Sequence, residues 1–394
     1  MSQNKLEPVP LLDLRAQFAT IKDQVMPLVE QVFQEQSFIL GPHVTRVEEA
    51  LADYLELEYA LGVSSGTDAL LLSLMALGVG PGDGVVTTPF TFFATIGSIA
   101  RLGAYPLLAD IDPRTYNLDP ARVAQLLERN DLPAKPKALV PVHLFGQPAE
   151  MDPLLELARQ HGLAVVEDAA QAIGARYPGS DADQPRPVGG LGTTGCFSFF
   201  PSKNLGGAGD GGLITCRDQE LAERLRSMRT HGSHPREKYR HIHLGGNFRL
   251  DAVQAVVIQA KLPHLDRWSA ARRANAARYD QLFQDSGLVD RELVSPPYRA
   301  WPQVESSHVF NQYVVRVQDR QGLMQRLQEE KIGHAVYYPV PLHLAECFAH
   351  LGYQKGDFPR AEEAADQVLA LPVYPELSPS QQERVVQVIA DFYA

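Results

Sequence analysis

The chain has 394 residues, of which 45% are hydrophobic and 21% are charged. This is the composition of a soluble globular protein, and it excludes wholesale disorder and collagen-like repeats. The 36 Lys and Arg residues are outnumbered by 47 Asp and Glu residues, which gives a net charge of −11. A nucleic-acid-binding protein is therefore a poor interpretation, because such proteins need a basic surface.

The cysteines and the apolar segments of the sequence indicate the cellular compartment in which the protein is expected. Cys196, Cys216 and Cys347 are odd in number and widely spaced, so neither a disulfide framework nor a zinc motif fits. The first 18 residues lack the apolar core of a signal peptide. The most apolar run, 69–79, is too short to cross a bilayer. We expect a cytoplasmic protein without a membrane partner.

Short apolar strands alternate with helices through the first two-thirds of the chain. Strands are expected at 59–63, 85–88, 105–109, 138–142, 163–166, 196–200 and 213–216. Helices are expected from Ala69, over 92–102, from Pro120, and over 151–161, 250–262 and 265–283. This alternation predicts an α/β fold with a mostly parallel central sheet covered by helices.

The pattern changes beyond Gly287. A Pro-rich stretch at 295–302 is followed by an expected strand at 308–317, a helix at 320–331, a strand at 334–338 and two more helices, of which the last begins at Ser378. We therefore expect two domains. The larger covers 1–264, and a smaller C-terminal α+β domain covers 265–394.

Four polar or aromatic segments follow the ends of expected strands. They are 64–68 (SSGTD), 88–93 (TPFTFF), 167–171 (EDAAQ) and the residues after Phe200. In open parallel sheets, ligands bind at the carboxyl ends of the strands. We therefore expect these segments to form one site.

Lys203 lies between an expected strand and a glycine cluster, in FSFFPSKNLGGAGDGG. Most lysines are exposed, so a surface position is one interpretation. The other is a partly buried amine, whose lowered pKa would let it form a Schiff base. Gly207, Gly209 and Gly212 match GxGxxG literally, but they lead into a strand rather than a helix. We therefore reject a Rossmann nucleotide site there.

Three other features suit a phosphorylated pyridine ring. Segment 64–68 begins a helix whose free N–H groups suit a phosphate, although N-capping alone would also explain it. Asp168 could hold a protonated ring nitrogen or could be a helix cap or an exposed acid, and Gln171 could reach the same ligand. Phe92 could stack on the ring or belong to the core. Together with Lys203, these features supply what pyridoxal phosphate requires of a protein.

The motifs together are similar to those of the DegT/DnrJ/EryC1/StrS family of pyridoxal-phosphate-dependent nucleotide-sugar aminotransferases. The resemblance begins at LLDLRAQF (11–18) and continues to the C-terminus. It is carried by SFILGPHVTRVEEALADYL, SSGTDAL, GPGD, TPFTFFAT, DIDPRTYNLDP, PVHLFGQPAEMD, VVEDAAQAIGA, FSFFPSKNLGGAGDGG, GGNFRLDAVQA and YYPVPLH. It implies the type I, aspartate aminotransferase-like fold of pyridoxal-phosphate-dependent transferases and a homodimer with shared active sites.

The resemblance also implies roles for matching residues. Lys203 is expected to be catalytic and to carry the cofactor, Asp168 to bind its pyridine nitrogen, and Gln171 to lie near its phenolic oxygen. The other expected cofactor-binding residues are Gly66, Thr67, Asp68, Ser198, the stacking residue Phe92, and Asn247, which would reach the phosphate from the neighbouring subunit. One branch of the family replaces the lysine with histidine and performs dehydration, so Lys203 favours transamination.

The segment 224–249 is rich in Arg and His and contains one acid, Glu237. A solvated loop is one interpretation, and a metal site at His241-x-His243 lacks supporting carboxylates, so no metal is expected. The functional interpretation is an electrostatic clamp for an anionic nucleotide sugar, which the resemblance supports. Expected substrate-binding residues are Asn204, Arg236, Tyr239, His241, His308, Tyr337, Tyr338 and His343.

The implied reaction moves an amino group from L-glutamate to a keto-sugar nucleotide through the pyridoxamine phosphate form of the cofactor. YRHIHLGGNFRLD resembles relatives that aminate a 3-keto sugar, either a UDP-linked 3-keto-hexuronic acid or a dTDP-linked 3-keto-6-deoxyhexose. A 4-keto sugar is the alternative. Two other classes stay open, namely a non-catalytic pyridoxal-phosphate-binding regulator and a pyridoxal-phosphate-dependent lyase or dehydratase.

Overall fold

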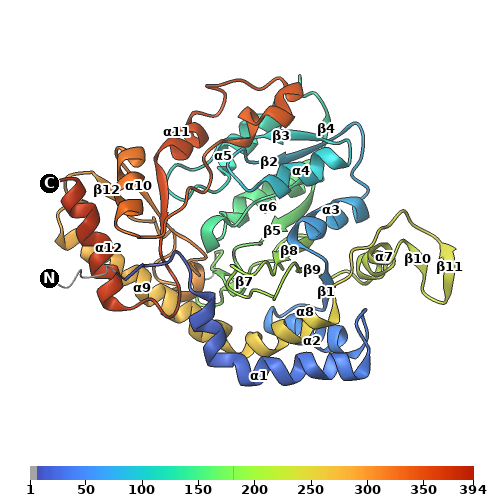
Figure 1. Cartoon of the computed structure of the whole chain (residues 1–394). Coiled ribbons are helices and arrows are strands. Elements are labelled where there is room, and N and C mark those ends of the chain that lie inside the picture. Colours follow the sequence, from blue (N-terminus) through green and yellow to red (C-terminus); the bar gives the residue numbers. More distant parts are fainter. Residues whose placement is uncertain (1–6, 181) are drawn as a thin grey trace.

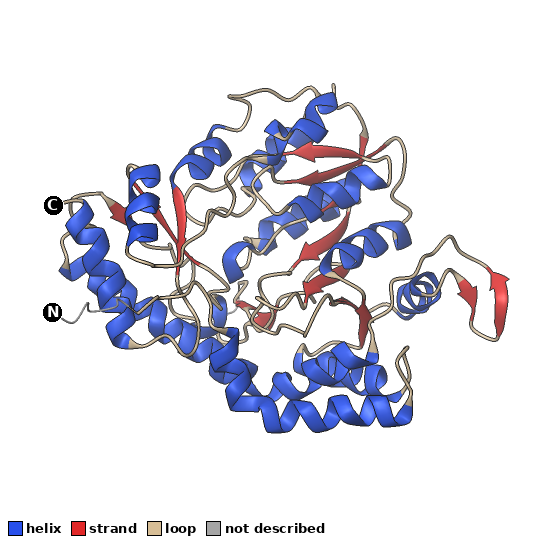
Figure 2. Ribbon diagram, in the orientation of Figure 1, coloured by secondary structure: helices blue, strands red, loops and turns tan. Residues whose placement is uncertain are grey.

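A seven-stranded sheet forms the centre of the computed structural model, which describes residues 7–180 and 182–394 (Figures 1 and 2). Residues 1–6 and Asp181 lie outside the described residues. The strands are β1 (Tyr59–Val63), β2 (Asp83–Thr87), β3 (Tyr105–Leu108), β4 (Lys135–Leu139), β5 (Ala164–Asp168), β8 (Thr194–Ser198) and β9 (Gly212–Cys216). Their spatial order is β1-β9-β8-β5-β4-β2-β3.

Most neighbours in this sheet are parallel. β3, β2, β4, β5 and β8 pair in parallel, whereas β9 runs antiparallel to both β1 and β8. The expected α/β fold with a mostly parallel sheet is confirmed. Alternate residues of each strand face opposite layers, so Val166 packs in one core and Val165 in the other.

Helices cover both faces of this sheet. The core containing Val166 also holds residues of α3 (Gly66–Ala76), α4 (Phe93–Arg101) and α7 (Gln219–Arg229). The core containing Val165 holds residues of α5 (Pro120–Leu127) and α6 (Met151–His161). α5 begins as expected, with Pro120 in the first turn and the Asp119 side chain accepting a hydrogen bond from the Ala121 amide.

A further group of helices packs against β8 and β9, on the same face of the sheet as α5 and α6. It consists of α1 (Leu14–Glu35), α2 (Pro42–Tyr54) and α8 (Ala252–Lys261), whose apolar side chains pack with Phe197, Phe199 and Leu213. Among the described residues, no helix has the length and apolar character needed to cross a bilayer. The apolar run expected to be a buried helix is α3, which ends at Ala76.

The C-terminal part has its own sheet and core. Strands β12 (Val294–Ser295), β13 (Tyr313–Val317) and β14 (Val368–Leu371) form an antiparallel sheet. The helices are α9 (Leu265–Asp285), α10 (Arg320–Glu329), α11 (Pro359–Gln367) and α12 (Pro379–Phe392). Val9 also belongs to this core and pairs with Ile332, so the N-terminal segment lies against the C-terminal part (Figure 1).

The remaining elements are short. β6 (Arg176–Tyr177) pairs with β7 (Arg186–Pro187), and β10 (Ser233–His234) pairs with β11 (Glu237–His241). In Figure 1 the β10–β11 hairpin projects from the body of the molecule beyond α7. Single 3-10 turns occupy Leu144–Gly146, Leu262–His264, Glu305–Ser307, Leu342–Leu344 and Glu346–Leu351.

Two strand predictions in the C-terminal part were wrong in extent or type. The segment 334–338 makes one isolated bridge, Ala335 to Ala370, instead of a strand, and the prolines that follow it provide no N–H donor for a ladder. The strand expected at 308–317 begins at Tyr313, because the amides of Val309 and Asn311 donate to the carbonyls of Gly146 and Phe145.

Candidate active site

A cavity of about 620 Å³ lies where β5 and β8 end. All four expected segments contribute to it, as the position of polar residues after strand ends predicted. Of the residues singled out from the sequence, the structure places Gly66, Thr67, Phe92, Asp168, Gln171, Ser198, Lys203, Tyr337 and Tyr338 in its wall.

The N-terminus of α3 forms one wall of this cavity. The hydroxyl of Ser65 caps the helix by accepting a hydrogen bond of 3.0 Å from the Asp68 amide, which leaves the first amides, Gly66 and Thr67, without intrahelical acceptors. A Cβ on Gly66 would lie 2.8 Å from Cβ of Ser198, so only glycine allows this close approach. Free amides at a helix N-terminus suit a phosphate.

Asp68 has a different place from the one expected. Its carboxylate accepts hydrogen bonds from the hydroxyls of Ser64 and Ser65, at 2.7 and 2.9 Å. It does not line the cavity. Asp68 therefore closes the turn that presents the free amides.

Asp168 is a buried acid at the end of β5. Its Oδ2 accepts a hydrogen bond of 2.8 Å from the Thr95 hydroxyl and its Oδ1 one of 3.2 Å from the Ala170 amide. Burial raises the pKa of this carboxyl, while the hydrogen bond from Thr95 and the charge of Lys203 lower it. Within the described part of the chain it forms no ion pair, so its charge is available to a cationic group such as a protonated pyridine nitrogen.

Lys203 lies in the same cavity as Asp168. Burial lowers the pKa of its amine to about 8, and the negative charge of Asp168 opposes part of this shift. Its amine makes no hydrogen bond to any of the described residues. This lowered pKa gives the amine a minor but appreciable neutral fraction near neutral pH, and the neutral amine is the nucleophile.

Aromatic and amide groups complete the wall. Phe92 is exposed at the N-terminus of α4, and its ring centroid lies 6.1 Å from that of Tyr338. Gln171 accepts a hydrogen bond of 2.8 Å from the Phe145 amide and donates one of 3.1 Å to the Tyr338 hydroxyl. These two bonds fix the orientation of the Gln171 amide and leave the Tyr338 hydroxyl proton free to donate to a ligand.

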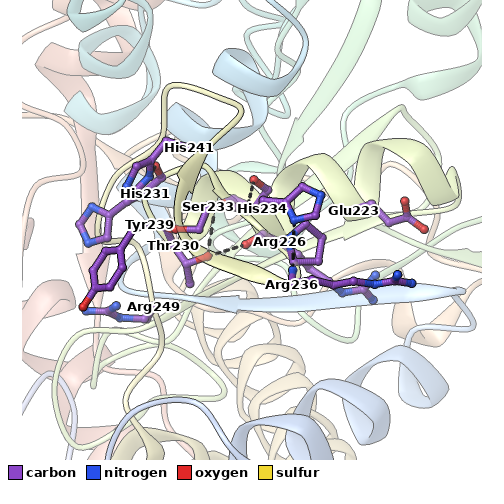
Figure 3. A pocket seen from close by; sticks show the side chains of 12 residues that line it. Glu223, Arg226, Thr230, His231, Ser233, His234, Arg236, Tyr239, His241 and Arg249 are labelled. Atoms are coloured by element: carbon purple, nitrogen blue, oxygen red, sulfur yellow. Dashed lines mark hydrogen bonds between the residues drawn. The ribbon is translucent and has the colours of Figure 1, made fainter.

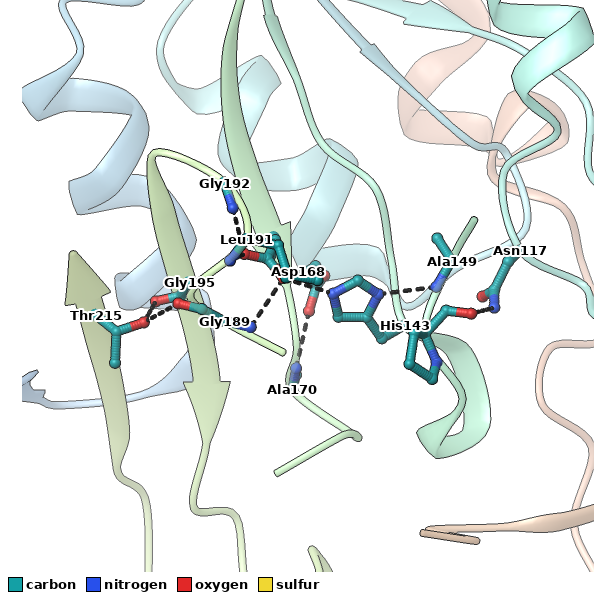
Figure 4. A network of polar contacts seen from close by, with 12 residues as sticks. Asn117, His143, Ala149, Asp168, Ala170, Gly189, Leu191, Gly192, Gly195 and Thr215 are labelled. Atoms are coloured by element: carbon teal, nitrogen blue, oxygen red, sulfur yellow. Dashed lines mark hydrogen bonds and ion pairs between the residues drawn. The ribbon is translucent and has the colours of Figure 1, made fainter. Parts of the chain in front are cut away.

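The acid next to Asp168 supports the site from the opposite face of β5. Glu167 is fully buried and accepts hydrogen bonds of 2.7–2.8 Å from the amides of Gly189, Leu191 and Gly192 (Figure 4). His143 donates to it through Nε2 at 3.0 Å, because Nδ1 already accepts from the Ala149 amide. This network holds His143 in the cavity wall.

A second cavity of about 1140 Å³ lies at the base of the β10–β11 hairpin (Figure 3). Arg236, Tyr239 and His241 line it, together with Arg226 and Arg249. It shares no described lining residue with the first cavity. Asn247 is exposed beside the hairpin, where it pairs with Thr230, and it does not line the first cavity.

Three expected substrate residues are engaged elsewhere. The side-chain amide of Asn204 donates a hydrogen bond of 2.9 Å to the Val309 carbonyl. The His308 ring stacks on Phe310 with centroids 3.8 Å apart, and Nε2 of His343 lies 3.0 Å from Glu362. These partners keep all three side chains out of the first cavity. Among the described residues, no group of three His, Cys, Asp or Glu side chains is arranged to hold a metal ion.

The fold and this cavity define the class of the protein, a pyridoxal-phosphate-dependent aminotransferase. The chain matches the family model described as the DegT/DnrJ/EryC1/StrS aminotransferase family over residues 19–390, and it belongs to that family. The sequence-based family assignment is thereby confirmed.

Some relatives in the family are named as regulatory proteins and others as aminotransferases. A protein of Geobacillus stearothermophilus called a pleiotropic regulatory protein is 48% identical over 98% of both chains. A UDP-N-acetyl-3-dehydro-alpha-D-glucosamine 3-aminotransferase of Acidithiobacillus ferrooxidans is 40% identical over 99% of this chain and 98% of its own.

Solved structures agree with this class. DesV of Streptomyces venezuelae, in complex with a ketimine intermediate, superposes with a TM-score of 0.89 at 40% identity over 98% of both chains. NtdA of Bacillus subtilis with bound PMP superposes with a TM-score of 0.88 at 27% identity, over 100% of this chain and 86% of its own.

Proposed function

We propose that the protein transfers the amino group of L-glutamate to a 3-keto sugar linked to UDP or dTDP. The observation that carries this proposal is the presence of Lys203 and Asp168 in one cavity, with the amine depressed in pKa and the acid free of any described ion pair. The name of the Acidithiobacillus ferrooxidans relative supports a 3-keto substrate. A 4-keto sugar is the alternative.

Five groups of the cavity would hold the cofactor. The Gly66 and Thr67 amides and the Ser198 hydroxyl would bind its phosphate, Asp168 its ring nitrogen, and Phe92 would cover the ring. When bound, pyridoxal phosphate supplies an electron sink for the carbanion that forms at the amine-bearing carbon. The ionised Asp168 would keep the ring nitrogen protonated, which the sink requires.

Lys203 would carry the proton in both half-reactions. Nζ would move a proton from Cα of L-glutamate to C4′ of the cofactor, and water would release 2-oxoglutarate. In the second half-reaction Nζ would move a proton from C4′ to the sugar carbon that receives the amino group. A lysine pKa of about 8 suits both roles, since the amine is neither fully protonated nor fully neutral near neutral pH.

We propose a homodimer in which the hairpin completes the partner's site. Arg236, Tyr239 and His241 do not line the first cavity of their own chain and belong to a hairpin that projects from the body. Exposed apolar side chains on α1, including Phe18 and Phe33, offer contact area for a second copy. The arginines around the hairpin cavity would bind the diphosphate of the nucleotide sugar.

Mixed dimers test this arrangement. Lys203→Ala and Asn247→Ala subunits are each expected to be impaired. In a mixed dimer, one site would receive Lys203 from one chain and Asn247 from the other, so activity should return. No recovery, with dimers verified by sedimentation, would contradict shared sites.

A regulatory protein is the second candidate. The name of the relative from Geobacillus stearothermophilus favours it, whereas the net charge of −11 does not favour DNA binding. Retention of DNA by the purified protein at moderate salt, together with no amino transfer, would support this candidate. If the protein retains no DNA, the result favours the proposed aminotransferase over a DNA-binding regulator.

Product stoichiometry tests the reaction and separates it from a lyase or dehydratase. One 2-oxoglutarate should form for each amino sugar, with UDP- and dTDP-linked 3-keto sugars compared against 4-keto sugars. Lys203→Ala should remove turnover and keep the fold. Consumption of a sugar without 2-oxoglutarate would indicate a lyase or dehydratase instead.

Two further expectations belong to this proposal. We place the domain division at 264/265, which the C-terminal core supports, although Val9 also packs in that core and Leu265 and Trp268 pack with helices of the larger domain. A cytoplasmic location is consistent with the three free cysteines, Cys196, Cys216 and Cys347.

A further inference from the structure

A small second space adjoins the active-site cavity. It measures about 60 Å³ and is walled by β14, by Leu11 and Leu12 of the N-terminal segment, and by Arg272 of α9. Ser202, Gln312 and Tyr337 line both spaces, so the two are immediate neighbours. One water needs about 10–15 Å³ by this measure, so the space has room for a carboxylate.

The guanidinium of Arg272 is buried here without a counter-ion. The side chain is 2% exposed, and NH1 donates to the carbonyls of Phe310 and Val373 at 3.2 and 2.7 Å. Its other N–H groups donate to none of the described residues. Burial lowers its pKa to about 10, and Glu376 acts against this shift without forming an ion pair. A buried cation without a counter-ion is costly even when carbonyls accept some of its hydrogen bonds, and a bound anion would offset that cost.

Two amides in the same wall also lack partners. Asn311 is 8% exposed, and neither its side-chain amide nor that of Gln312 makes a hydrogen bond to another described residue. Oδ1 of Asn311 and Oε1 of Gln312 are both buried and unpaired. Buried polar groups nearly always have partners. These two oxygens are acceptors and would not bind an anion. The side-chain NH₂ groups of Asn311 and Gln312 and the remaining N–H groups of Arg272 also donate to none of the described residues, so several unpaired donors belong to the wall of one small space.

We propose that this space binds a carboxylate of the amino donor, with Arg272 supplying the charge and Asn311 and Gln312 supplying N–H groups. The inference rests on the proposed function, because it concerns the amino acid that reacts beside Lys203. L-Glutamate has two carboxylates, and both present the same chemistry to this space. The α-carboxylate is common to all amino acids, whereas the distal one would select glutamate over neutral donors.

Three variants and one control test the site in the holoenzyme. Gln312→Met and Asn311→Leu remove amide donors, and Arg272→Lys keeps a cation but loses the guanidinium geometry. Arg273→Lys is the matched control, because Arg273 is the next residue of α9, pairs with Glu305 at 3.0 Å and does not line the space. Circular dichroism and melting temperature show which variants fold, and Gln312→Met is the substitution with the least buried surroundings.

The first measurement is calorimetric binding of glutarate, a dicarboxylate with no amine. The three variants should weaken glutarate binding by about tenfold or more, the effect of losing one hydrogen bond to a charged group. Arg273→Lys should bind as the wild type does. Unchanged binding in folded Gln312→Met and Asn311→Leu, or no binding of glutarate to the wild type, would overturn the site and leave a water-filled space.

The second measurement is the concentration dependence of each half-reaction. The variants should raise the KM for L-glutamate about tenfold and leave the KM for the sugar nucleotide unchanged. Equal loss in both half-reactions would mean a structural role and would overturn the proposal. An effect on L-alanine as well as L-glutamate would assign the α-carboxylate, and an effect on L-glutamate alone would assign the distal one.

The two proposals can fail separately. If the protein transfers no amino group but glutarate binds and Gln312→Met weakens it, the carboxylate site stands and the proposed function fails. If amino transfer occurs and glutarate binding is insensitive to all three variants, the proposed function stands and the carboxylate site fails.

Discussion

The hydroxyl of Thr95 donates a hydrogen bond of 2.8 Å to Oδ2 of Asp168. Oγ1 of Thr91 lies 2.9 Å from Oγ1 of Thr95. Because Thr95 has one hydroxyl proton and gives it to Asp168, Thr91 must be the donor in the second bond. A chain of two hydroxyls at the start of α4 thus orients the acid at the end of β5 and opposes the rise in pKa that burial causes.

Thr95→Val should weaken the hold of Asp168 on the cofactor. The carboxyl loses the hydrogen bond that favours its ionised form, so its pKa should rise. We expect cofactor affinity and kcat to fall by about tenfold, the effect of one hydrogen bond to a charged group. Thr95→Ser keeps the hydroxyl and should behave as the wild type does. Equal effects of Val and Ser would mean that packing, rather than the hydrogen bond, matters at this position.

The reactivity of Lys203 should depend on pH in a defined direction. Its pKa of about 8 means that the amine is protonated, and therefore unreactive, below that pH. In the cofactor-free protein, the rate of borohydride-trappable attachment of pyridoxal phosphate should rise as pH increases through about 8. Asp168→Asn removes a negative charge that raises this pKa, so the midpoint should move to lower pH. A midpoint near the ordinary lysine value of 10.5 in both proteins would contradict this prediction.

Gly66→Ala should damage the expected phosphate site. The new Cβ would lie 2.8 Å from Cβ of Ser198, so the helix terminus and β8 must separate. Overpacking of this kind costs roughly 1–3 kcal/mol. We expect weaker binding of pyridoxal phosphate and of inorganic phosphate, measured by calorimetry. Gly80→Ala is the matched control, because a Cβ there meets no atom within 4 Å. Normal phosphate binding by folded Gly66→Ala would contradict the assignment of this site.

Glu167→Gln should destabilise the fold. The carboxylate accepts from three amides and from His143, and a glutamine would direct an NH₂ group at some of these donors. Breaking a buried charged network of this kind costs about 3 kcal/mol in the free energy of unfolding. Chemical denaturation measures this cost. Glu156→Gln, at an exposed pair with Arg159, should change the free energy of unfolding far less, because solvent screens this pair. Similar losses in both variants would refute the argument.

The sequence predicted the central sheet because its strands are short, apolar and separated by helix signals. The residues that follow β5 and β8 were predicted to meet at one site, since parallel strands end at a common edge. Two strands in the C-terminal part were misjudged. The sequence does not show that the amides before Tyr313 bond to the 145–146 turn, nor that β14 pairs with β13.

The sequence could not show which polar side chains face the cavity. Thr95 lies in the first turn of α4 and Thr91 lies two residues before that helix, and only the fold brings the two hydroxyls to Asp168. Asp68 was expected to bind the cofactor because it lies in SSGTD. In the structure its carboxylate accepts hydrogen bonds from the hydroxyls of Ser64 and Ser65. The sequence predicted that His308 and His343 bind substrate. In the structure the His308 ring stacks on Phe310 and His343 lies beside Glu362, and the sequence shows neither contact.

Arg272 and Gln312 gave no signal before the structure was known. Arg272 lies in a charged helix in which Arg273 and Arg278 form ion pairs with Glu305 and Glu383. In the fold, NH1 of Arg272 donates hydrogen bonds to the carbonyls of Phe310 and Val373, which belong to two segments far from α9 in the sequence. Such long-range contacts leave no local pattern.

We infer that Lys203 holds pyridoxal phosphate and that the bound cofactor accepts an amino group from L-glutamate. The most direct test is the absorbance spectrum of the purified holoenzyme before and after L-glutamate is added. We predict a visible band from the lysine-bound cofactor that gives way to the near-ultraviolet band of the pyridoxamine form, with Lys203→Ala lacking the first band. A wild-type spectrum without the lysine-bound band in saturating pyridoxal phosphate, or one that L-glutamate leaves unchanged, would contradict the account.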